Sequence, residues 1–188
     1  MKKPYFLIAL FTAVIIVTCL LGYRFIADSN KTKSEKEYQA TLELVTDINQ
    51  NSDFGGLELL KLSNNKENQP SQGTSDILPK FAEDAKDGVE GIYFNYPYDS
   101  NDYRLSKISI TQVPYHIYGI TEGQNLNEAA LLLEDKGFTL QETISDNDVD
   151  FVLYRQHHVS ISLKVGNGNR TISTIIVSVY DKLDDAVY

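Results

Sequence analysis

The chain lacks tryptophan and has a single cysteine, Cys19, among its 188 residues. Because no disulfide can form within a chain that holds one thiol, the fold must be stable through its core alone. That core must come from isoleucine, leucine, valine, phenylalanine and tyrosine. Hydrophobic residues make up 42% of the chain and charged residues 23%, an ordinary globular composition that excludes disorder of the whole chain.

Basic residues are also scarce, since 17 lysines and arginines stand against 26 aspartates and glutamates. Three of the basic residues, Lys2, Lys3 and Arg24, lie within residues 1–27, which contain no acid. The rest of the chain holds the other 14 basic residues and all 26 acidic ones, a net charge of −12. A body that acidic repels nucleic acid, so we exclude DNA and RNA as partners.

An uncharged apolar run occupies residues 4–23. As a helix it would be about 30 Å long, the thickness of the hydrocarbon core of a membrane. Lys2 and Lys3 precede the run, which favours a cytoplasmic N-terminus. The sequence therefore predicts that residues 1–27 form a single transmembrane helix, an uncleaved signal anchor, with an extracytoplasmic domain behind it.

Two alternatives to this anchor stay open. Residues 16–19 resemble the lipobox of bacterial lipoproteins, in which the cysteine, here Cys19, is acylated and tethers the chain to the membrane. Thr18 departs from that pattern, because the residue before the cysteine is usually smaller. The second alternative is cleavage by signal peptidase after Ala27.

The segment that follows the anchor begins with polar residues. We predict a juxtamembrane spacer over residues 28–37 and a helix over residues 38–48, where apolar residues recur at helical spacing. Residues 63–76 contain no aliphatic or aromatic residue and are predicted to form a surface loop. Residues 76–87 resemble a short helix that ends near Gly88.

A second helix is predicted over residues 126–136. Asn125 is a suitable N-terminal cap, and Glu128 places a negative charge in the first turn, where it favours the helix dipole. Gly137 is typical of the left-handed residue that ends a helix.

Two segments have the pattern of a β-hairpin. In the first, over residues 91–111, alternation predicts that Ile92 and Phe94 face the core and that Tyr93 faces outward. The second, over residues 159–180, has a Gly-Asn-Gly turn between two alternating apolar runs.

The two hairpins align with each other in sequence. The pairs are Ile92, Phe94 and Tyr96 with Ile161, Leu163 and Val165, then Leu105, Ser106, Ile108 and Ile110 with Ile172, Ser173, Ile175 and Val177. We therefore predict a duplicated α+β domain, with one repeat over residues 38–112 and the other over residues 113–188. In each repeat a helix would pack on a small antiparallel sheet, which leaves the other face of the sheet free.

The second repeat resembles the small protein A and β-lactamase-inhibitory-protein group. The resemblance lies in Gly119-Ile120, Gly123, Glu128-Ala129, Leu133, Gly137-Phe138, Tyr154 and the hairpin that follows. It implies a small extracytoplasmic domain that binds other proteins and performs no chemistry. Val113-Pro114 and the helix after it are also similar to the PASTA module, which implies cell-wall binding.

Catalytic and metal-binding patterns are not apparent. The segment Asp146–Asp150 has alternating oxygen ligands but lacks the glycine and glutamate of a calcium-binding loop, and we interpret it as a turn. His157 and His158 are adjacent and would point to opposite faces of a strand, while His116 lies far away in sequence. We therefore expect no enzyme, no cofactor and no metal.

Tyrosines gather around the first hairpin, and their rings make rigid contact surfaces in protein interfaces. Tyr93, Tyr98 and Tyr103 are our candidate partner-binding residues. The sequence predicts a membrane-anchored, extracytoplasmic binding module whose partner is an envelope protein or a cell-wall component. Two alternatives stay open, a peptidoglycan-binding module of PASTA type and a small extracytoplasmic hydrolase.

Overall fold

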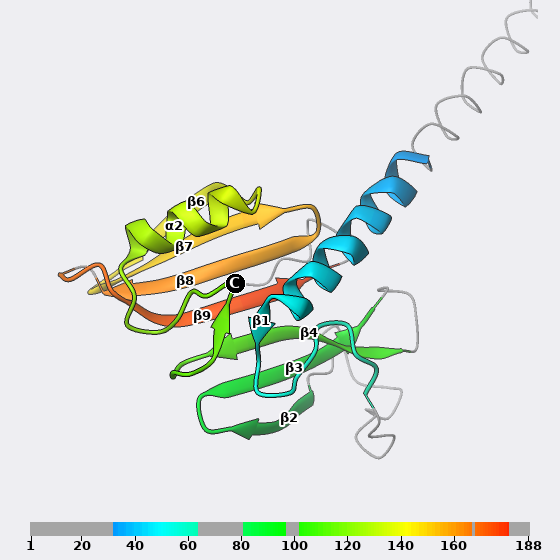
Figure 1. Cartoon of the computed structure of the whole chain (residues 1–188), viewed down its shortest axis with the longest axis horizontal. Helices are drawn as coiled ribbons and strands as arrows, with labels where there is room; N and C mark the ends of the chain where they lie inside the picture. Colours follow the sequence, from blue (N-terminus) through cyan, green and yellow to red (C-terminus); the bar gives the residue numbers. More distant parts are fainter. Residues whose placement is uncertain (1–31, 64–80, 97–101, 167, 181–188) are drawn as a thin grey trace, which may run out of the picture. The chain divides into compact units, whose positions relative to one another are not determined.

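The computed structural model describes residues 32–63, 81–96, 102–166 and 168–180 (Figure 1). These residues form two helices and a set of antiparallel strands, so the α+β class is as predicted.

The chain divides into two units after Gln39. The described part of the first unit, residues 32–39, is helical, so the helix begins inside the segment predicted to be a spacer. The second unit, Ala40–Tyr188, contains the rest of that helix, which ends at residue 50, and all of the strands. Both predicted repeats therefore contribute strands to the same unit.

No helix in the described part of the chain is long and apolar enough to cross a membrane. The transmembrane helix in our fold-class prediction is therefore wrong, and residues 1–27, from which it was predicted, lie outside the described residues. The first described helix, over residues 32–50, is amphipathic. Its buried residues include Val45 and Ile48, while Glu43 is exposed, a pattern that suits packing against a sheet.

Seven strands form one antiparallel sheet in the order β2-β3-β4-β9-β8-β7-β6. Their bounds are Phe81–Lys86 for β2, Val89–Asn95 for β3, Tyr103–Ile110 for β4, Thr139–Asp146 for β6, Val149–Gln156 for β7, Val159–Gly166 for β8 and Ile172–Val179 for β9. Two short strands, β1 (Ser52–Asp53) and β5 (His116–Ile117), pair separately.

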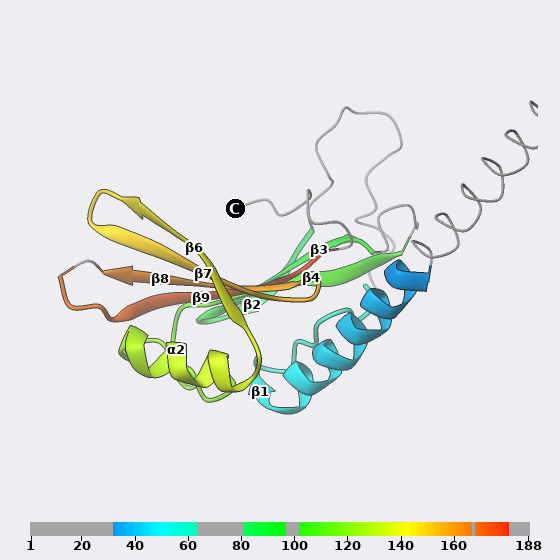
Figure 2. The same ribbon diagram turned by 90° about the horizontal axis from the view of Figure 1, so that it is seen from above.

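Helix α2 (Leu126–Asp135) and the helix portion from residue 40 onward lie on the same face of the large sheet (Figure 2). The core lies between this face and the helices. Its largest fully buried side chains come from both halves of the chain and include Ile48, Leu105, Ile108, Leu133, Phe138, Ile161 and Leu163.

The first turn of α2 forms as predicted. The side chain of Asn125 accepts a hydrogen bond from the N–H of Asn127 at 2.9 Å, and Glu128 lies in the first turn. After the helix Gly137 has φ +88°, the left-handed conformation that glycine adopts without strain.

The β3–β4 and β8–β9 hairpins have matching registers. Strands β4 and β9 lie side by side, with Ile108 opposite Val177 and Ile110 opposite Ile175. Each hairpin also has a register shift, between Ile92 and Tyr93 in β3 and between Lys164 and Val165 in β8. These shifts occur at equivalent positions, because Ser106 and Ser173 lie equally far along their strands from Ser109 and Ile176, which pair with each other.

A serine occupies the extra residue of each irregular pairing. Ser106 lies between the partners of Ile92 and Tyr93, and Ser173 lies between the partners of Lys164 and Val165. Ser106 Oγ donates to the Arg104 carbonyl at 2.9 Å, and Ser173 Oγ donates to the Lys164 carbonyl at 3.2 Å. The serines aligned from sequence therefore occupy equivalent positions in the pairing, although Ser106 bonds within its own strand and Ser173 bonds across to β8.

The first strands of the hairpins align differently from our prediction. The pairing makes Val89, Gly91 and Tyr93 equivalent to Ile161, Leu163 and Val165. Tyr93 is only 3% exposed and faces the helices, whereas Ile92 and Phe94 lie on the other face. The predicted orientation was wrong because the core face of β3 begins with Val89 and Gly91, and glycine gives no apolar signal.

Gly91 is needed at this position because its neighbours fill the space of a side chain. A Cβ atom there would lie 2.7 Å from Cδ1 of Leu105 and 3.1 Å from Cδ1 of Leu57. Since Leu105 is fully buried, it has little room to move. We expect Gly91→Ala to lower the free energy of unfolding by about 1–2 kcal/mol in urea denaturation, because overpacking outweighs the entropy gain.

The matched control for this prediction is Gly168→Ala. A Cβ atom at Gly168 meets no atom within 4 Å, and its φ is not left-handed. An unchanged urea midpoint for Gly91→Ala would contradict the close packing of β3 against β4.

The segment 81–86 is the strand β2 and not the predicted end of a helix. A two-residue turn at Asp87 and Gly88 connects it to β3, and Gly88 has φ +93°. Long-range pairing with β3 determines this strand, and the local helical spacing of a short segment does not reveal such pairing.

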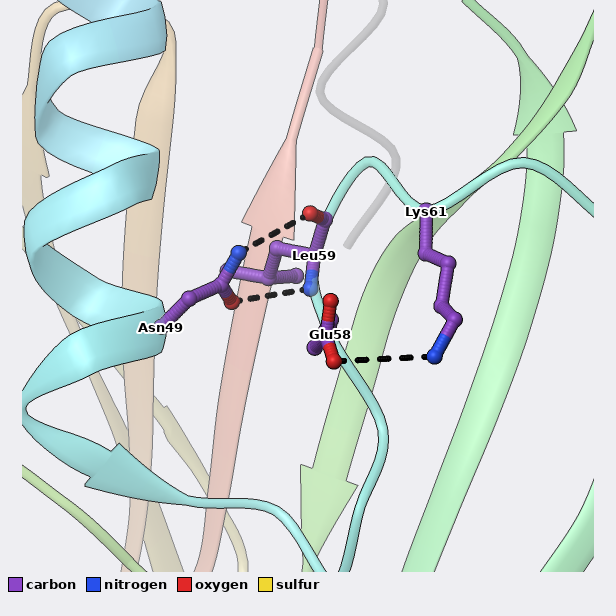
Figure 3. A network of polar contacts seen from close by, with 4 residues as sticks. All are labelled: Asn49, Glu58, Leu59 and Lys61. Carbon is purple, nitrogen blue, oxygen red and sulfur yellow. Dashed lines mark hydrogen bonds and ion pairs between the residues drawn. The ribbon is translucent and has the colours of Figure 1, made fainter.

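The loop that directly follows β1 is held to the first helix by two hydrogen bonds of the side-chain amide of Asn49 (Figure 3). Asn49 Nδ2 donates to the Leu59 carbonyl at 3.1 Å, and the Leu59 N–H donates to Asn49 Oδ1 at 2.9 Å. An exposed ion pair between Lys61 and Glu58, at 3.5 Å, lies beside it. The paired amide bonds fix the segment where Leu59 enters the core.

Candidate partner-binding surface

The sheet has two faces of different character. One face packs against the helices, and the other, which we name the open face, lies on the side away from both described helices (Figure 2). On strands β3, β4 and β7 to β9, alternation and pairing place the following residues on the open face: Glu90, Ile92, Phe94, Arg104, Lys107, Ser109, Phe151, Leu153, Arg155, Ser160, Ser162, Lys164, Thr174, Ile176 and Ser178.

The open face on β3, β4 and β7 to β9 is basic although the chain is acidic. On these strands its four basic residues are Arg104, Lys107, Arg155 and Lys164, and its one acid is Glu90, while the whole chain has a net charge of −9. Two further acids, Glu142 and Asp146, lie on the same side of the edge strand β6. The basic residues come from β4, β7 and β8, which the β4–β9 and β8–β9 pairings bring into one sheet. A local surface opposite in charge to the rest of the molecule attracts an anionic partner.

Hydroxyl side chains occupy the middle of the open face. Ser160 pairs across β8 and β9 with Ser178, and Lys164 pairs with Thr174. Ile176 lies opposite Ser162 on one side and Ser109 on the other. Ser160 is buried, whereas Ser162, Lys164, Thr174, Ile176 and Ser178 are partly exposed, so most of this middle part is open to solvent.

Aromatic rings flank this polar area. Lys164 Nζ lies 5.9 Å from the centre of the Phe151 ring, within the range of a cation–π contact. Phe94 and Ile92 occupy the far side on β3 and are partly exposed. The open face therefore offers cations, hydroxyls and apolar rings together.

A polar cluster lies at one end of this face, where β7, β8 and the end of β9 meet. The rings of His158 and Tyr180 stack at 6.2 Å with an angle of 7°, and Arg155 Cζ lies 5.6 Å from the Tyr180 ring. Burial raises the pKa of Tyr180 against the opposing effects of Arg155 and Ser160.

Two polar atoms of this cluster have no hydrogen-bond partner within the described part of the chain. They are Arg155 Nε and His158 Nδ1, and each is buried, while Ser160 lies close enough to the Tyr180 hydroxyl to lower the pKa of that tyrosine through a hydrogen bond. Buried polar groups normally form hydrogen bonds, and an unsatisfied one costs about 1–3 kcal/mol. A ligand group that reached these atoms would therefore be bound favourably.

The structure does not assemble the predicted tyrosine surface. Tyr93 is buried under the helices and cannot contact a partner. Tyr103 is partly buried and lies on the same side of β4 as the buried Leu105. Tyr98 and Cys19 lie outside the described residues.

The sequence predicted a free face of the sheet but not its basic character, because the charges of the open face are spread over four strands. The alternation of β8 does contain a hint, since Ser160, Ser162 and Lys164 occupy every second position between apolar residues. Their association with Lys107 depends on the pairing order, which the sequence pattern does not show.

The residues considered for metal binding are separated. Within the described ranges no group of three or more His, Cys, Asp or Glu side chains is placed to hold a metal ion. The segment Asp146–Asp150 forms the turn between β6 and β7, as interpreted from sequence, with Asp146 opposite Val149. His157 and His158 form the turn between β7 and β8, and His116 Nδ1 accepts a hydrogen bond from the Gly119 N–H at 3.3 Å.

No protein-family model, curated protein or solved structure matches the chain. The resemblances to the small protein A group and to PASTA modules therefore stay predictions.

Proposed function

We propose that the chain is a binding module without catalytic activity that works at the membrane on its extracytoplasmic side. The basic open face of the sheet is the observation that carries this proposal. Its partner is an envelope protein that presents an acidic surface.

Several features support this assignment. The open face combines cations with apolar rings, the mixture that interfaces use for attraction and contact area. The unsatisfied atoms of Arg155 and His158 add hydrogen-bonding capacity at one end. Attachment at the membrane and the extracytoplasmic side are inferred from residues 1–27, where lysines precede an apolar run.

Charge reversal on the open face tests the proposal. The variant Lys107→Glu with Lys164→Glu changes two strand residues that are partly exposed. Cells that carry the tagged full chain are crosslinked, and the captured proteins are quantified. We expect capture of the partner to fall by about tenfold or more, because close charge pairs across interfaces couple by about 1.5 kcal/mol or more.

The matched control is Lys33→Glu with Lys36→Glu, which makes the same change in net charge on the exposed first helix. This control should capture the partner as the unchanged chain does. Equal losses in both double variants would show that net charge, and not the open face, determines binding. Unchanged capture by the open-face variant would overturn the proposal.

A further inference from the structure

Strand β6 differs from the other strands of the sheet in its exposure. All eight of its residues, Thr139–Asp146, are exposed, including Leu140 at 55% and Ile144 at 37%. It is the terminal strand of the order β2-β3-β4-β9-β8-β7-β6, and among the described strands it pairs only with β7. Its outer edge therefore presents backbone groups that no described strand satisfies.

The hairpin geometry identifies those groups. Asp146 pairs with Val149 across a two-residue turn, so these two residues form a hydrogen-bonded pair, and the pattern alternates from there. The backbone N–H and C=O groups of Glu142 and Ile144 therefore also form hydrogen bonds with β7. The N–H and C=O groups of Thr143 and Ser145 point to the outer edge, where a further strand would pair.

The usual protections of an edge strand are weak here. Natural edges are blocked by proline, lysine, bulges or short length. Residues 139–146 contain no proline and no basic residue, and the bulge between Leu140 and Glu142 leaves Glu142–Asp146 in regular register. A regular edge of five residues is long enough to receive an extended segment.

The acidic residues of β6 determine which charge a partner segment must have. Glu142, Asp146 and Asp148 are exposed, and residues 139–148 contain no base. A second copy of this strand would bring acids against acids, which destabilises strand pairing. A basic segment of another protein would pair opposite charges instead.

The order of acidic and apolar residues along β6 also indicates the order of residues in a partner strand. Glu142, Ile144 and Asp146 share the open-face side of β6, because their partners on β7 are Leu153, Phe151 and Val149. A strand laid beside them places its own alternate residues opposite. The best complement is basic, then apolar, then basic, at every second position.

We propose that the outer edge of β6 binds an extended segment of a partner protein that pairs as an eighth strand, with two basic residues flanking an apolar one at alternate positions. This site lies at the edge of the sheet and does not rest on the open-face proposal.

The test uses the full chain in mild neutral detergent and two synthetic heptapeptides. One is Thr-Lys-Thr-Val-Thr-Lys-Thr, and the other has glutamate in place of both lysines. Amide hydrogen exchange of the β6 segment is measured with and without each peptide. We expect the lysine peptide to slow exchange at Thr143 and Ser145 by about tenfold or more, and the glutamate peptide to leave it unchanged.

Two variants sharpen the test. Thr143→Pro removes an outward N–H that no described strand uses, so the sheet stays intact while protection of Ser145 by the lysine peptide is lost. Glu142→Lys with Asp146→Lys should reverse the preference, so that the glutamate peptide protects the edge. The control Glu43→Lys, on the first helix, should behave as the unchanged chain.

Three results would overturn the proposal. The first is equal protection, or none, by both peptides. The second is protection that appears on the open face and not at β6. The third is protection that rises with protein concentration without peptide, since that would make a second copy the occupant. Because the open-face variant Lys107→Glu with Lys164→Glu leaves β6 unchanged, the failure of either proposal is distinguishable.

Discussion

Replacing Phe138 by alanine should lower the free energy of unfolding by about 3–5 kcal/mol, the usual cost of removing a large aromatic side chain from a core. Phe138 is 1% exposed and is the largest fully buried side chain in the described part of the chain. Its N–H donates to the Leu133 carbonyl at 3.0 Å, and its ring meets the Tyr118 ring edge-on at 6.4 Å. The residue therefore joins the end of α2 to the loop before that helix.

Urea denaturation of the full chain, followed by tyrosine fluorescence, measures this effect. Phe138→Leu retains most of the volume and should cost less than about 1.5 kcal/mol. The control Leu131→Ala changes a side chain that is 68% exposed and should stay within about 0.5 kcal/mol of the unchanged chain. A Phe138→Ala midpoint close to that control would contradict the placement of Phe138 in the core.

Stability should also fall steeply above pH 10, because three buried tyrosines keep their protons in the folded chain. Burial raises the pKa of Tyr118, and a hydrogen bond of 2.8 Å to Asp47 and the charge of that carboxylate raise it further. Burial likewise raises the pKa of Tyr154, with a smaller contribution from Glu134, and burial raises that of Tyr180.

The direction of the pH effect follows from proton linkage. In the unfolded chain these tyrosines lose their protons near their ordinary pKa of 10.0, while the folded chain retains them. Unfolding then releases protons, so the contribution to stability is complete below pH 10 and decreases above it. The limiting slope is about 1.4 kcal/mol per pH unit for each tyrosine.

Urea midpoints measured at pH 8, 10 and 11 would test this linkage. Tyr118→Phe removes one titrating group and should make the decrease above pH 10 shallower by about 1.4 kcal/mol per pH unit at most. It also removes the hydrogen bond to Asp47, so its stability at pH 8 should be lower by about 1 kcal/mol. Midpoints that stay level or rise from pH 10 to pH 11 would contradict the burial of these hydroxyls.

Local signals in the sequence predicted the elements that depend on local physics. The start of α2 at Asn125, its end before Gly137 and the hairpin of β8 and β9 all follow from capping and turn residues that act within a few positions. The aligned serines, Ser106 and Ser173, were also visible from the sequence. Their role at matched irregularities in the pairing required the register of the strands.

Long-range pairing decided what the sequence pattern missed. Strand β2 looks helical in isolation and becomes a strand through β3. The inward face of β3 includes Gly91, so alternation of apolar residues indicated the wrong face and placed Tyr93 outside. The long apolar run predicted a transmembrane helix, but no helix in the described residues is long and apolar enough to cross a membrane, and residues 1–31 lie outside those residues.

The basic character of the open face was missed for the same physical reason. Arg155, Lys164 and Lys107 lie on three strands, and only the pairing of β4 with β9 places them on one face. Each of them separately is an ordinary charged strand residue. The tyrosines drew attention because they are close in sequence, but closeness in sequence did not place them on one surface.

Site-specific photocrosslinking in living cells tests the central claim most directly. A benzoylphenylalanine in place of Ser162 lies at the centre of the open face, and one in place of Leu131 lies on the exposed side of α2. The proposed function predicts a discrete adduct with one envelope protein from position 162, lost when Lys107 and Lys164 are changed to glutamate, and no such adduct from position 131. Adducts from position 131 alone, or an adduct from position 162 that is indifferent to the charge reversal, would contradict it.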